Sequence, residues 1–422
     1  MLNDILYKIK KLIPESAFTF LQPAYHYILS LTGALIYGFP SRKIFVVGIT
    51  GTKGKTSTAE LVNVMLEEAG FKTALLGTLR FKIGEESKMN KQKMTMPGRF
   101  FVQQFLKRAV KEKCDYVIVE MTSQGVLQYR HKFVQLDALI FTNLSPEHIE
   151  SHGSYENYIQ AKLEIAKALE KSHKKRKFLI VNADDKEAPR FLNNNIEEQY
   201  KYSILDAEPY ELGKNGLIMT FDGVEIKAHL AGKFNIYNIL AAATFAKTQN
   251  IGIETIRNAV EKFKGIRGRV ERIEEGQDFT AIVDYAHTAD SLEKLYEAFS
   301  HSKKICVLGN TGGGRDKWKR PVMASVADKH CDYIILTDED PYDEDPREII
   351  RDMEEGIQNK EYKVIMDRRE AVNQALSSAK TGDTVLITGK GTDPYIMGPN
   401  NTKTEWDDAT IVREELKKLN LI

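Results

Sequence analysis

Short apolar runs rich in β-branched residues alternate along this chain with longer amphipathic segments, and this alternation restricts the fold more than any other feature. In the first half the strand-like runs are KIFVVGI, KTALLGT, DYVIVEM, DALIFTN and KFLIVNA. Helical periodicity lies between them, over TAELVNVMLEEAG and PGRFFVQQFLKRAVKEK. Such alternation predicts an α/β fold in which a mainly parallel sheet is covered by helices on both faces.

A second alternating series begins after FKGIRGRVERI, with strands TAIVDYA, KKICVLGN, DYIILTDED, YKVIMD and DTVLITG and helices DSLEKLYEAFS and REIIRDMEEGIQ. We place a boundary at about 263–266. The expected organisation is a short N-terminal segment (1–43), a central mononucleotide-binding domain (44–265) and a C-terminal, Rossmann-like α/β domain (266–422). Glycine turns within 200–230 predict an antiparallel hairpin at the sheet edge.

The bulk composition excludes some classes of protein. The chain has 422 residues and a formal net charge of +1, so bulk electrostatics do not indicate a nucleic-acid binder. Its three cysteines, Cys114, Cys306 and Cys331, lie far apart and form no CxxC. We therefore expect reduced cysteines, a cytoplasmic location and no structural metal cluster.

The stretch 17–41 contains no Asp, Glu, Lys or Arg, although lysines precede it and Arg42 and Lys43 follow. Its length approaches that of a membrane span, but it carries His26, Gln22, Pro23 and several hydroxyl groups. We expect a helix that packs on the next domain. Peripheral membrane contact and a true span are the alternatives.

A glycine-rich loop joins the first strand to a helix, in VVGITGTKGKTSTAE (46–60). Glycines there let backbone N–H groups approach a phosphate, and the helix directs its positive end to the same place. Lys55 would neutralise the β- and γ-phosphates and the Thr56 hydroxyl would hold Mg²⁺. The pattern departs from GxxxxGK[ST] at Ile49, and a generic turn with a surface lysine is the alternative. The expected ATP-binding residues are Gly51, Thr52, Lys53, Gly54, Lys55, Thr56 and Ser57.

The loop GITGTKGKT (48–56) resembles that of the Mur ligase superfamily, which makes amide bonds at the expense of ATP and includes peptidoglycan-precursor ligases and folylpolyglutamate synthetase. VEMTSQGVLQYR (119–130) and FTNLSPEHIESHGSYENYIQAK (141–162) resemble the members that add the third peptide residue, the MurE type. GKFNIYNILAAA, GRVE, VDYAHTADSLE, GNTGGGRDKWKRPVM and TGKGT follow in order. The resemblance covers roughly 44–395.

The resemblance implies a reaction through an acyl phosphate, formed when a substrate carboxylate attacks the γ-phosphate of ATP and consumed by an incoming amine. Glu120, at the end of a strand, and His148 correspond to ligands of Mg²⁺. A solvated carboxylate and a structural histidine are the alternatives. Lys162 corresponds to a lysine that is carbamylated and, as an anion, orients metal beside the phosphate. A plain salt-bridging lysine is its alternative.

Further contacts are implied by the same resemblance. For the nucleotide they are Asn235, Arg269, Asp284 and His287, with polar residues of helix ends and capped turns as the alternative. For the acceptor, the muramoyl-peptide substrate, they are Thr95, Thr122, Gln128 and Arg130. The hydroxyls would be modest donors, and Arg130 would form a fork for a carboxylate.

The incoming amine is chosen in the family by a segment after the third C-terminal strand. Enzymes specific for meso-diaminopimelate carry DNPR there, whereas TDEDPYDEDPRE (337–348) places Tyr342 where the arginine would stand. Asp340 and, in GKGTD, Asp393 form an acidic pocket that favours a cationic amine such as lysine, with Arg315 left for the α-carboxylate. Arg347 could replace the missing arginine after a loop shift, and a solvated acidic loop is the other alternative.

The N-terminal region departs from the family, since MurE-type ligases carry a UDP-binding domain of ~100 residues where 47 residues precede Gly48 here. We expect 1–43 to replace it. The leading hypothesis is a MurE-like ligase that adds an amino acid to a muramoyl-dipeptide-like precursor. Alternatives are a folylpolyglutamate-synthetase-like ligase, a ligase for a lipid-linked precursor, and a non-catalytic ATP-binding subunit. Retention of Lys55, Glu120, His148 and Lys162 together argues against the last.

Overall fold

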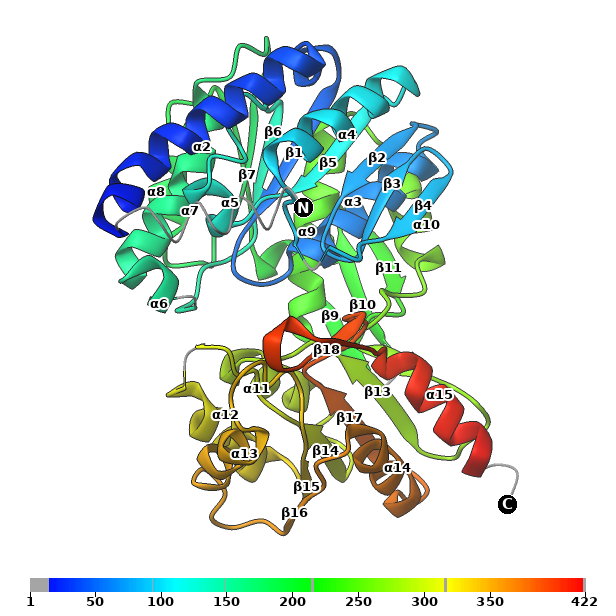
Figure 1. The fold of residues 1–422 in the computed structure, drawn as a ribbon. Helices are drawn as coiled ribbons and strands as arrows, with labels where there is room; N and C mark the ends of the chain where they lie inside the picture. The colour runs from blue at the N-terminus through cyan, green and yellow to red at the C-terminus, as the bar shows by residue number, and fades with distance from the viewer. Residues whose placement is uncertain (1–14, 93, 148, 214–215, 315–316, 420–422) are drawn as a thin grey trace. The chain divides into compact units, whose positions relative to one another are not determined.

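The computed structural model describes residues 15–92, 94–147, 149–213, 216–314 and 317–419, without the side chains of 15–20 and 149–150. The described residues fall into two compact units (Figure 1). The first lies within Met1–Glu147, Ser154–Ser203 and Ile239–Ile256, and the second within His148–Gly153, Ile204–Asn238 and Arg257–Ile422.

An eight-stranded sheet forms the first unit, in the order β4-β3-β2-β5-β1-β6-β7-β8. Strands β2, β5, β1, β6, β7 and β8 run parallel to one another, and β3 and β4 pair antiparallel at one edge. The five strands that the sequence predicted here are all present. The bounds are β1 (Phe45–Thr50), β2 (Thr73–Leu76), β3 (Arg80–Ile83), β4 (Glu86–Met89), β5 (Tyr116–Glu120), β6 (Ala138–Phe141), β7 (Phe178–Asn182) and β8 (Glu198–Tyr202).

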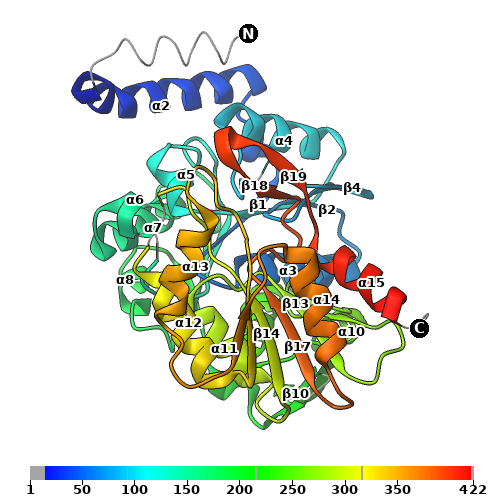
Figure 2. The same ribbon diagram turned by 60° about the horizontal axis from the view of Figure 1, so that its bottom comes forward.

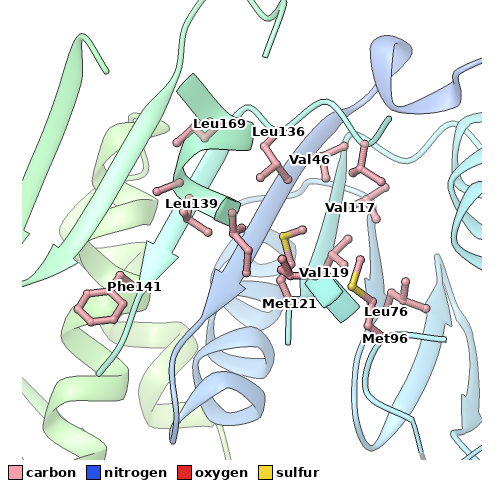
Figure 3. Packing of buried hydrophobic residues seen from close by; sticks show 14 of the residues in the cluster. Val46, Leu76, Met96, Val117, Val119, Met121, Leu136, Leu139, Phe141 and Leu169 are labelled. Atoms are coloured by element: carbon pink, nitrogen blue, oxygen red, sulfur yellow. The ribbon is translucent and has the colours of Figure 1, made fainter. Parts of the chain in front are cut away.

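Helices cover this sheet because its central strands are buried on both faces. On one face, strand residues such as Val46, Val119 and Leu139 form a core with Leu169 of α7 (Figure 3). Leu106 of α4 belongs to the same core. Helix α3 contacts β1, β2 and β5. The helices that lie wholly in this unit are α3 (Lys55–Glu68), α4 (Arg99–Lys111), α5 (Ser123–Leu127), α7 (Tyr155–Glu170) and α8 (Ala188–Leu192). Helix α6 (Ile149–His152) belongs to the second unit, and α9 (Lys233–Thr248) and α10 (Ile253–Lys262) are divided between the two.

The uncharged N-terminal stretch forms helix α2 (Glu15–Tyr37), which lies along α4 (Figures 1 and 2). Its inner side is fixed by Ser30, whose hydroxyl donates to the Tyr129 carbonyl oxygen at 2.8 Å. Within the described residues, no helix has both the length and the apolar character needed to cross a bilayer. The prediction of a packed helix therefore holds, and the alternative of a true span does not.

Three antiparallel strands of the second unit form a sheet of their own, in the order β11-β10-β9. They are β9 (Tyr210–Gly213), β10 (Gly216–Phe221) and β11 (Val224–Ala228), preceded by the short helix η2 (Ile204–Ala207). The predicted hairpin is therefore present as β10–β11, but it belongs to this separate sheet and not to the edge of the large one.

A six-stranded sheet in the order β12-β13-β17-β14-β15-β16 is the framework of the second unit, and all its pairs are parallel except β12–β13. The five strands predicted from the second alternating series are present. The strands are β12 (Glu271–Ile273), β13 (Thr280–Asp284), β14 (Lys304–Leu308), β15 (Tyr333–Leu336), β16 (Tyr362–Val364) and β17 (Thr384–Thr388), with a separate pair β18 (Tyr395–Met397) and β19 (Lys403–Glu405).

Alternate residues of these strands pack on opposite helical layers. Cys306 and Leu308 of β14 face one core, and Ile305 and Val307 face the other. Figure 2 shows α11, α12 and α13 on one side of the sheet and α14 and α15 on the other. The helices are α11 (Ala289–Ala298), α12 (Lys319–His330), α13 (Pro346–Glu354), α14 (Arg368–Ser378) and α15 (Asp408–Leu419).

Cys306 and Cys331 form a disulfide between β14 and the end of α12, with Cα atoms 6.2 Å apart. The expectation of reduced cysteines was therefore wrong for this pair. Cys114 is free and buried. The two partners are 25 residues apart in sequence, and only the packing of α12 on the sheet brings them together.

Candidate active site

The glycine-rich loop leaves the carboxyl end of β1 and enters α3 at Gly54, which is its N-cap residue and has a φ of 81°. Gly51 has a φ of 149°, and a Cβ there would lie 1.9 Å from the Thr142 hydroxyl oxygen. A residue with a side chain could not take this place without displacing the neighbouring strand end. Lys55 Nζ donates to the carbonyl oxygens of Gly51 and Thr52, at 2.8 and 2.9 Å. Ser57 follows on α3.

Glu120 lies at the carboxyl end of β5, beside the start of α3, and its side chain is buried. It accepts hydrogen bonds from the Thr56 hydroxyl at 2.9 Å and from the backbone N–H and hydroxyl of Thr78 at 2.7 and 2.8 Å. Burial raises the pKa of this carboxyl, while the bonds from Thr78 and the charge of Lys55 oppose the rise. The structure therefore brings Thr56 and Glu120 together at the phosphate loop.

Lys162 projects from α7 into the same loop and is only 2% exposed. Its Nζ donates to the Gly51 carbonyl oxygen at 2.8 Å, the acceptor that Lys55 also uses, and lies 5.1 Å from the centre of the Tyr158 ring. Burial lowers the pKa of Lys162 well below its usual range, and the nearby charge of Lys55 lowers it further. Both effects favour the neutral amine over the ammonium.

The sequence did not single out several residues that hold this site. Asn143 fixes the loop, since its carbonyl oxygen accepts from Thr52 N at 2.8 Å and its Oδ1 from Lys53 N at 3.0 Å. Glu147 forms an ion pair with Lys53 at 3.2 Å. Tyr158 lies one turn before Lys162 on α7, so helical spacing could have indicated it. Thr78 follows β2, and only the adjacency of β2 and β5 places it beside Glu120.

The expected acceptor residues gather beyond the ends of β2 and β5. The Thr95 hydroxyl oxygen lies 3.0 Å from that of Thr78. Thr122 caps α5, where its hydroxyl accepts from Gly125 N at 3.1 Å. Arg130 donates to the Met96 carbonyl oxygen and, at 2.6 Å, to Gln128 Oε1.

The expected nucleotide contacts of the second unit lie in two groups. Asn235 is buried, with its amide donating to the Ala231 carbonyl oxygen at 2.8 Å. Asp284 joins GRVE to VDYAHT, because its carboxylate accepts from Val270 N at 2.7 Å. The Arg269 guanidinium lies 4.3 Å from the centre of the Tyr285 ring, and His287 Nδ1 lies 2.7 Å from the Tyr285 carbonyl oxygen.

Asp340 and Asp393 converge in the second unit, but on a lysine of the chain itself. Lys390 Nζ lies 2.8 Å from both oxygens of Asp340 and 3.0 Å from Asp393 Oδ2. Burial alone would lower the pKa of Lys390, but the two carboxylates raise it above its usual value. The ring of Tyr342 packs on Gly313, where a Cβ would lie 2.9 Å from a ring carbon. The sequence interpretation missed Lys390, although it lies in TGKGT.

His148 and Arg315, expected to be a metal ligand and a carboxylate partner, lie outside the described residues.

The geometry is that of an ATP-using α/β enzyme with a second lysine at its phosphate loop, and comparison with known proteins gives the family. The model of the Mur ligase middle domain matches residues 49–246, and that of the Mur ligase, glutamate ligase domain matches 268–391. A UDP-N-acetylmuramoyl-L-alanyl-D-glutamate--2,6-diaminopimelate ligase of Syntrophomonas wolfei is 36% identical over 92% of this chain and 81% of that protein.

Solved structures agree with this assignment. One of a UDP-N-acetylmuramoyl-L-alanyl-D-glutamate--2,6-diaminopimelate ligase has a TM-score of 0.62 at 26% identity, over 89% of this chain and 79% of that one. The folylpolyglutamate synthase of Mycobacterium tuberculosis, complexed with ADP and AMPPCP, has a TM-score of 0.69 over 87% and 95%, and its 13% identity makes this a likeness of fold alone. The chain belongs to the Mur ligase family and is an ATP-dependent, ADP-forming amino-acid ligase. Within that family its relatives are of the MurE type.

Proposed function

We propose that this enzyme adds an amino acid to a muramoyl-dipeptide-like cell-wall precursor, and that Lys162 acts as a carbamate beside the phosphate loop. The observation that carries the proposal is the convergence of two lysine amines, Lys55 and Lys162, on the Gly51 carbonyl oxygen. Two ammonium groups would repel each other there, and burial together with the charge of Lys55 lowers the pKa of Lys162, which favours its neutral amine. Only a neutral amine adds to CO₂, forming an N–C bond and releasing a proton.

The donor set at the loop fits a magnesium ion. Thr56 and Glu120 offer a hydroxyl and a carboxylate oxygen 2.9 Å apart, and hard oxygen donors are the ligands that Mg²⁺ takes beside a substrate phosphate. When bound, the ion neutralises charge that gathers on the transferred phosphoryl group. Thr78 would hold the Glu120 carboxylate in place through its two hydrogen bonds.

The reaction then depends on how the chain's own groups handle negative charge. The acceptor carboxylate attacks the γ-phosphorus of ATP and the bond to the β-phosphate oxygen breaks, which gives ADP and an acyl phosphate. The amine attacks the acyl carbon, loses a proton and expels phosphate. Lys55 and the N–H groups at the start of α3 would stabilise the phosphoryl oxygens, and Thr95, Thr122, Gln128 and Arg130 would orient the acceptor. Asn235, Arg269, Asp284 and His287 would contact the nucleotide.

Phosphate release with a panel of acceptors tests this function. We expect turnover with UDP-N-acetylmuramoyl-L-alanyl-D-glutamate in the presence of a suitable amine, because the relatives bear the name of that acceptor. Turnover only with a folate acceptor would instead assign a folylpolyglutamate-synthetase-like activity, and turnover only with a lipid-linked muramoyl peptide would assign a lipid-linked precursor. ATP binding without turnover of any acceptor would contradict the proposal.

We further propose that the incoming amino acid is L-lysine or a similar dibasic amino acid. Asp340 and Asp393 place two carboxylates around the ammonium of Lys390, and carboxylates at this place favour an incoming ammonium over an incoming carboxylate. Tyr342 stands where a carboxylate clamp would need arginine. A mispaired charge in such a partly buried site predicts a preference on the order of a hundredfold in kcat/KM over meso-diaminopimelate. Competition between the two amines on one acceptor measures it.

The relatives named for 2,6-diaminopimelate favour the opposite outcome, and Arg347 at the start of α13 offers a route to it. A preference for meso-diaminopimelate that collapses in Arg347→Ala, but not in the same-helix control Arg351→Ala, would show that the clamp had moved. A preference for meso-diaminopimelate that neither substitution changes would contradict the lysine proposal outright.

We also propose that α2 contacts an anionic membrane surface peripherally. Large apolar side chains at helical spacing face solvent on it, with Leu21 56%, Ile28 61% and Leu35 60% exposed, and the exposed cations Arg42 and Lys43 follow. The protein should co-sediment with anionic vesicles, and Ile28→Glu with Leu35→Glu should abolish this.

A matched control for the vesicle experiment is Leu205→Glu, since Leu205 is 68% exposed on η2, in the other unit. Unmodified protein that stays in the supernatant at every vesicle concentration would remove the membrane proposal.

A further inference from the structure

Two arginines and a histidine from three separate segments meet beside the expected acceptor residues. Arg99 opens α4, Arg130 follows α5, and His26 comes from α2. An Arg99 Nη2 atom contacts His26 Nδ1, and Arg99 Nε donates to the Gln128 carbonyl oxygen at 2.8 Å. The side chain of Gln128 in turn holds Arg130. These contacts place the two arginines and the histidine close to the segment that contains Gln128.

The charge balance of this cluster is positive within the part of the chain that the structure describes. Among the residues that the structure describes, no carboxylate pairs with Arg99 or Arg130, which instead contact carbonyl, amide and imidazole groups. Burial lowers the pKa of both arginines, and the charge of Arg130 lowers that of Arg99 further. Both side chains are partly buried, and a cation withdrawn from water is normally paired with an anion.

Two buried donors of the cluster are also unused. Arg130 Nε and His26 Nε2 are buried and make no hydrogen bond in the structure. Because Arg99 donates to His26 Nδ1, the neutral ring carries its proton on Nε2. Burial, with Arg99 and Arg130 nearby, lowers the pKa of His26 to about 4. Unused donors and unbalanced positive charge are together what an anion would satisfy.

We propose that Arg99, Arg130 and His26 form an anion site for a carboxylate or phosphate group of the acceptor, so that helix α2 is part of the acceptor site. Arginine forks match the planar or tetrahedral oxygens of both groups. The proposal rests on the proposed function for the identity of the acceptor, since Arg130 and Gln128 were assigned there. Arg99 and His26 are new members of that site.

Binding of inorganic phosphate and of glutarate, each without ATP or amine, tests the site on the intact protein. The probe is the NMR titration of the His26 ring, which reports this site and not the phosphate loop. A bound anion favours the protonated ring, so either ion should raise the His26 pKa by about one unit or more. Arg99→Gln should weaken this binding about tenfold or more. Arg108→Gln should not, because Arg108 lies on the same helix as Arg99 but is exposed and forms an ion pair with Glu86 of β4.

The two probes separate the sources of the anion. A response to phosphate alone assigns a phosphate of the acceptor, a response to glutarate alone assigns a carboxylate, and a response to both supports the shared chemistry. Lys55→Ala should leave the His26 response unchanged. The anion site is therefore tested independently of ligase activity, even if the ligase proposal fails. No shift of the His26 pKa with either ion would overturn the inference.

Stability and kinetics distinguish a binding role from a structural one. If Arg99 holds an anion, Arg99→Gln should keep or raise the Tm, because it relieves repulsion from Arg130, and should raise the KM for the acceptor with little effect on the KM for ATP. A lower Tm with an unchanged acceptor KM would show that Arg99 only ties α2 to α4. His26→Phe, which preserves the bulk of the ring, should give the same kinetic pattern as Arg99→Gln.

Discussion

Lys162→Ala should lower kcat for ligation by a factor on the order of 10²–10³ and should regain part of it when acetate is added. The side chain is buried against the phosphate loop and its lowered pKa favours the neutral amine, which is the form that can take up CO₂ as a carbamate, and the small carboxylate would imitate that carbamate. Lys162→Arg should stay as inactive as Lys162→Ala, because arginine forms no carbamate. Initial rates of phosphate release with and without acetate measure both effects.

The control is Lys167→Ala, because Lys167 lies on the same helix but is partly exposed and pairs with Glu164 at 2.8 Å. Its kcat should remain close to wild type. ¹³C NMR of protein equilibrated with ¹³C-bicarbonate gives a readout independent of activity, since a carbamate signal should be present in wild type and absent from Lys162→Ala. An arginine variant with full activity would show that the positive charge, and not a carbamate, is required.

The stability of a Lys162→Met variant separates loss of chemistry from loss of fold. The folded-state pKa of Lys162 lies below its unfolded value, so burying the amine costs stability at neutral pH and the cost shrinks as pH rises. Methionine has a similar shape without that cost. We expect its free energy of unfolding near pH 7 to be unchanged or higher than that of wild type.

The element types could be predicted from the sequence because local patterns determine them. Runs such as YVIVE and TVLIT are strands since β-branched residues cluster there, and each is buried in the observed sheets. Their order could not be predicted in this way. The placement of β5 beside β2 brings Thr78 to Glu120, and the contact depends on long-range packing that no local pattern contains.

The candidate site divides in a similar way. Loop residues from Gly51 to Thr56 could be proposed from the sequence because glycine spacing and a following helix carry a local signal. The partners of charged residues were missed, since Lys390 lies 50 residues from Asp340 and His26 lies 73 residues from Arg99. The Cys306–Cys331 disulfide was missed for the same reason, because the sequence gives no sign that α12 ends beside β14.

Lys55→Ala should lower ATP turnover by a factor on the order of a thousand or more while leaving the fold intact. In the structure Lys55 Nζ donates hydrogen bonds to the carbonyl oxygens of Gly51 and Thr52. We propose that the β- and γ-phosphates bind beside this ammonium, so that its charge would meet the charge that develops during transfer. Uncharged alanine leaves the N–H groups of α3 to act alone.

The measurement is ADP formation under saturating acceptor and amine, with circular dichroism and Tm to confirm folding. Lys171→Ala is the control, because Lys171 is an exposed lysine at the end of α7, away from the loop. The two lysines at Gly51 also predict a specific coupling: without Lys55, the pKa of Lys162 should rise, since a repelling charge has been removed. Turnover of Lys55→Ala within about tenfold of wild type would contradict the phosphate-loop assignment, because a contact to transition-state charge contributes several times more than that.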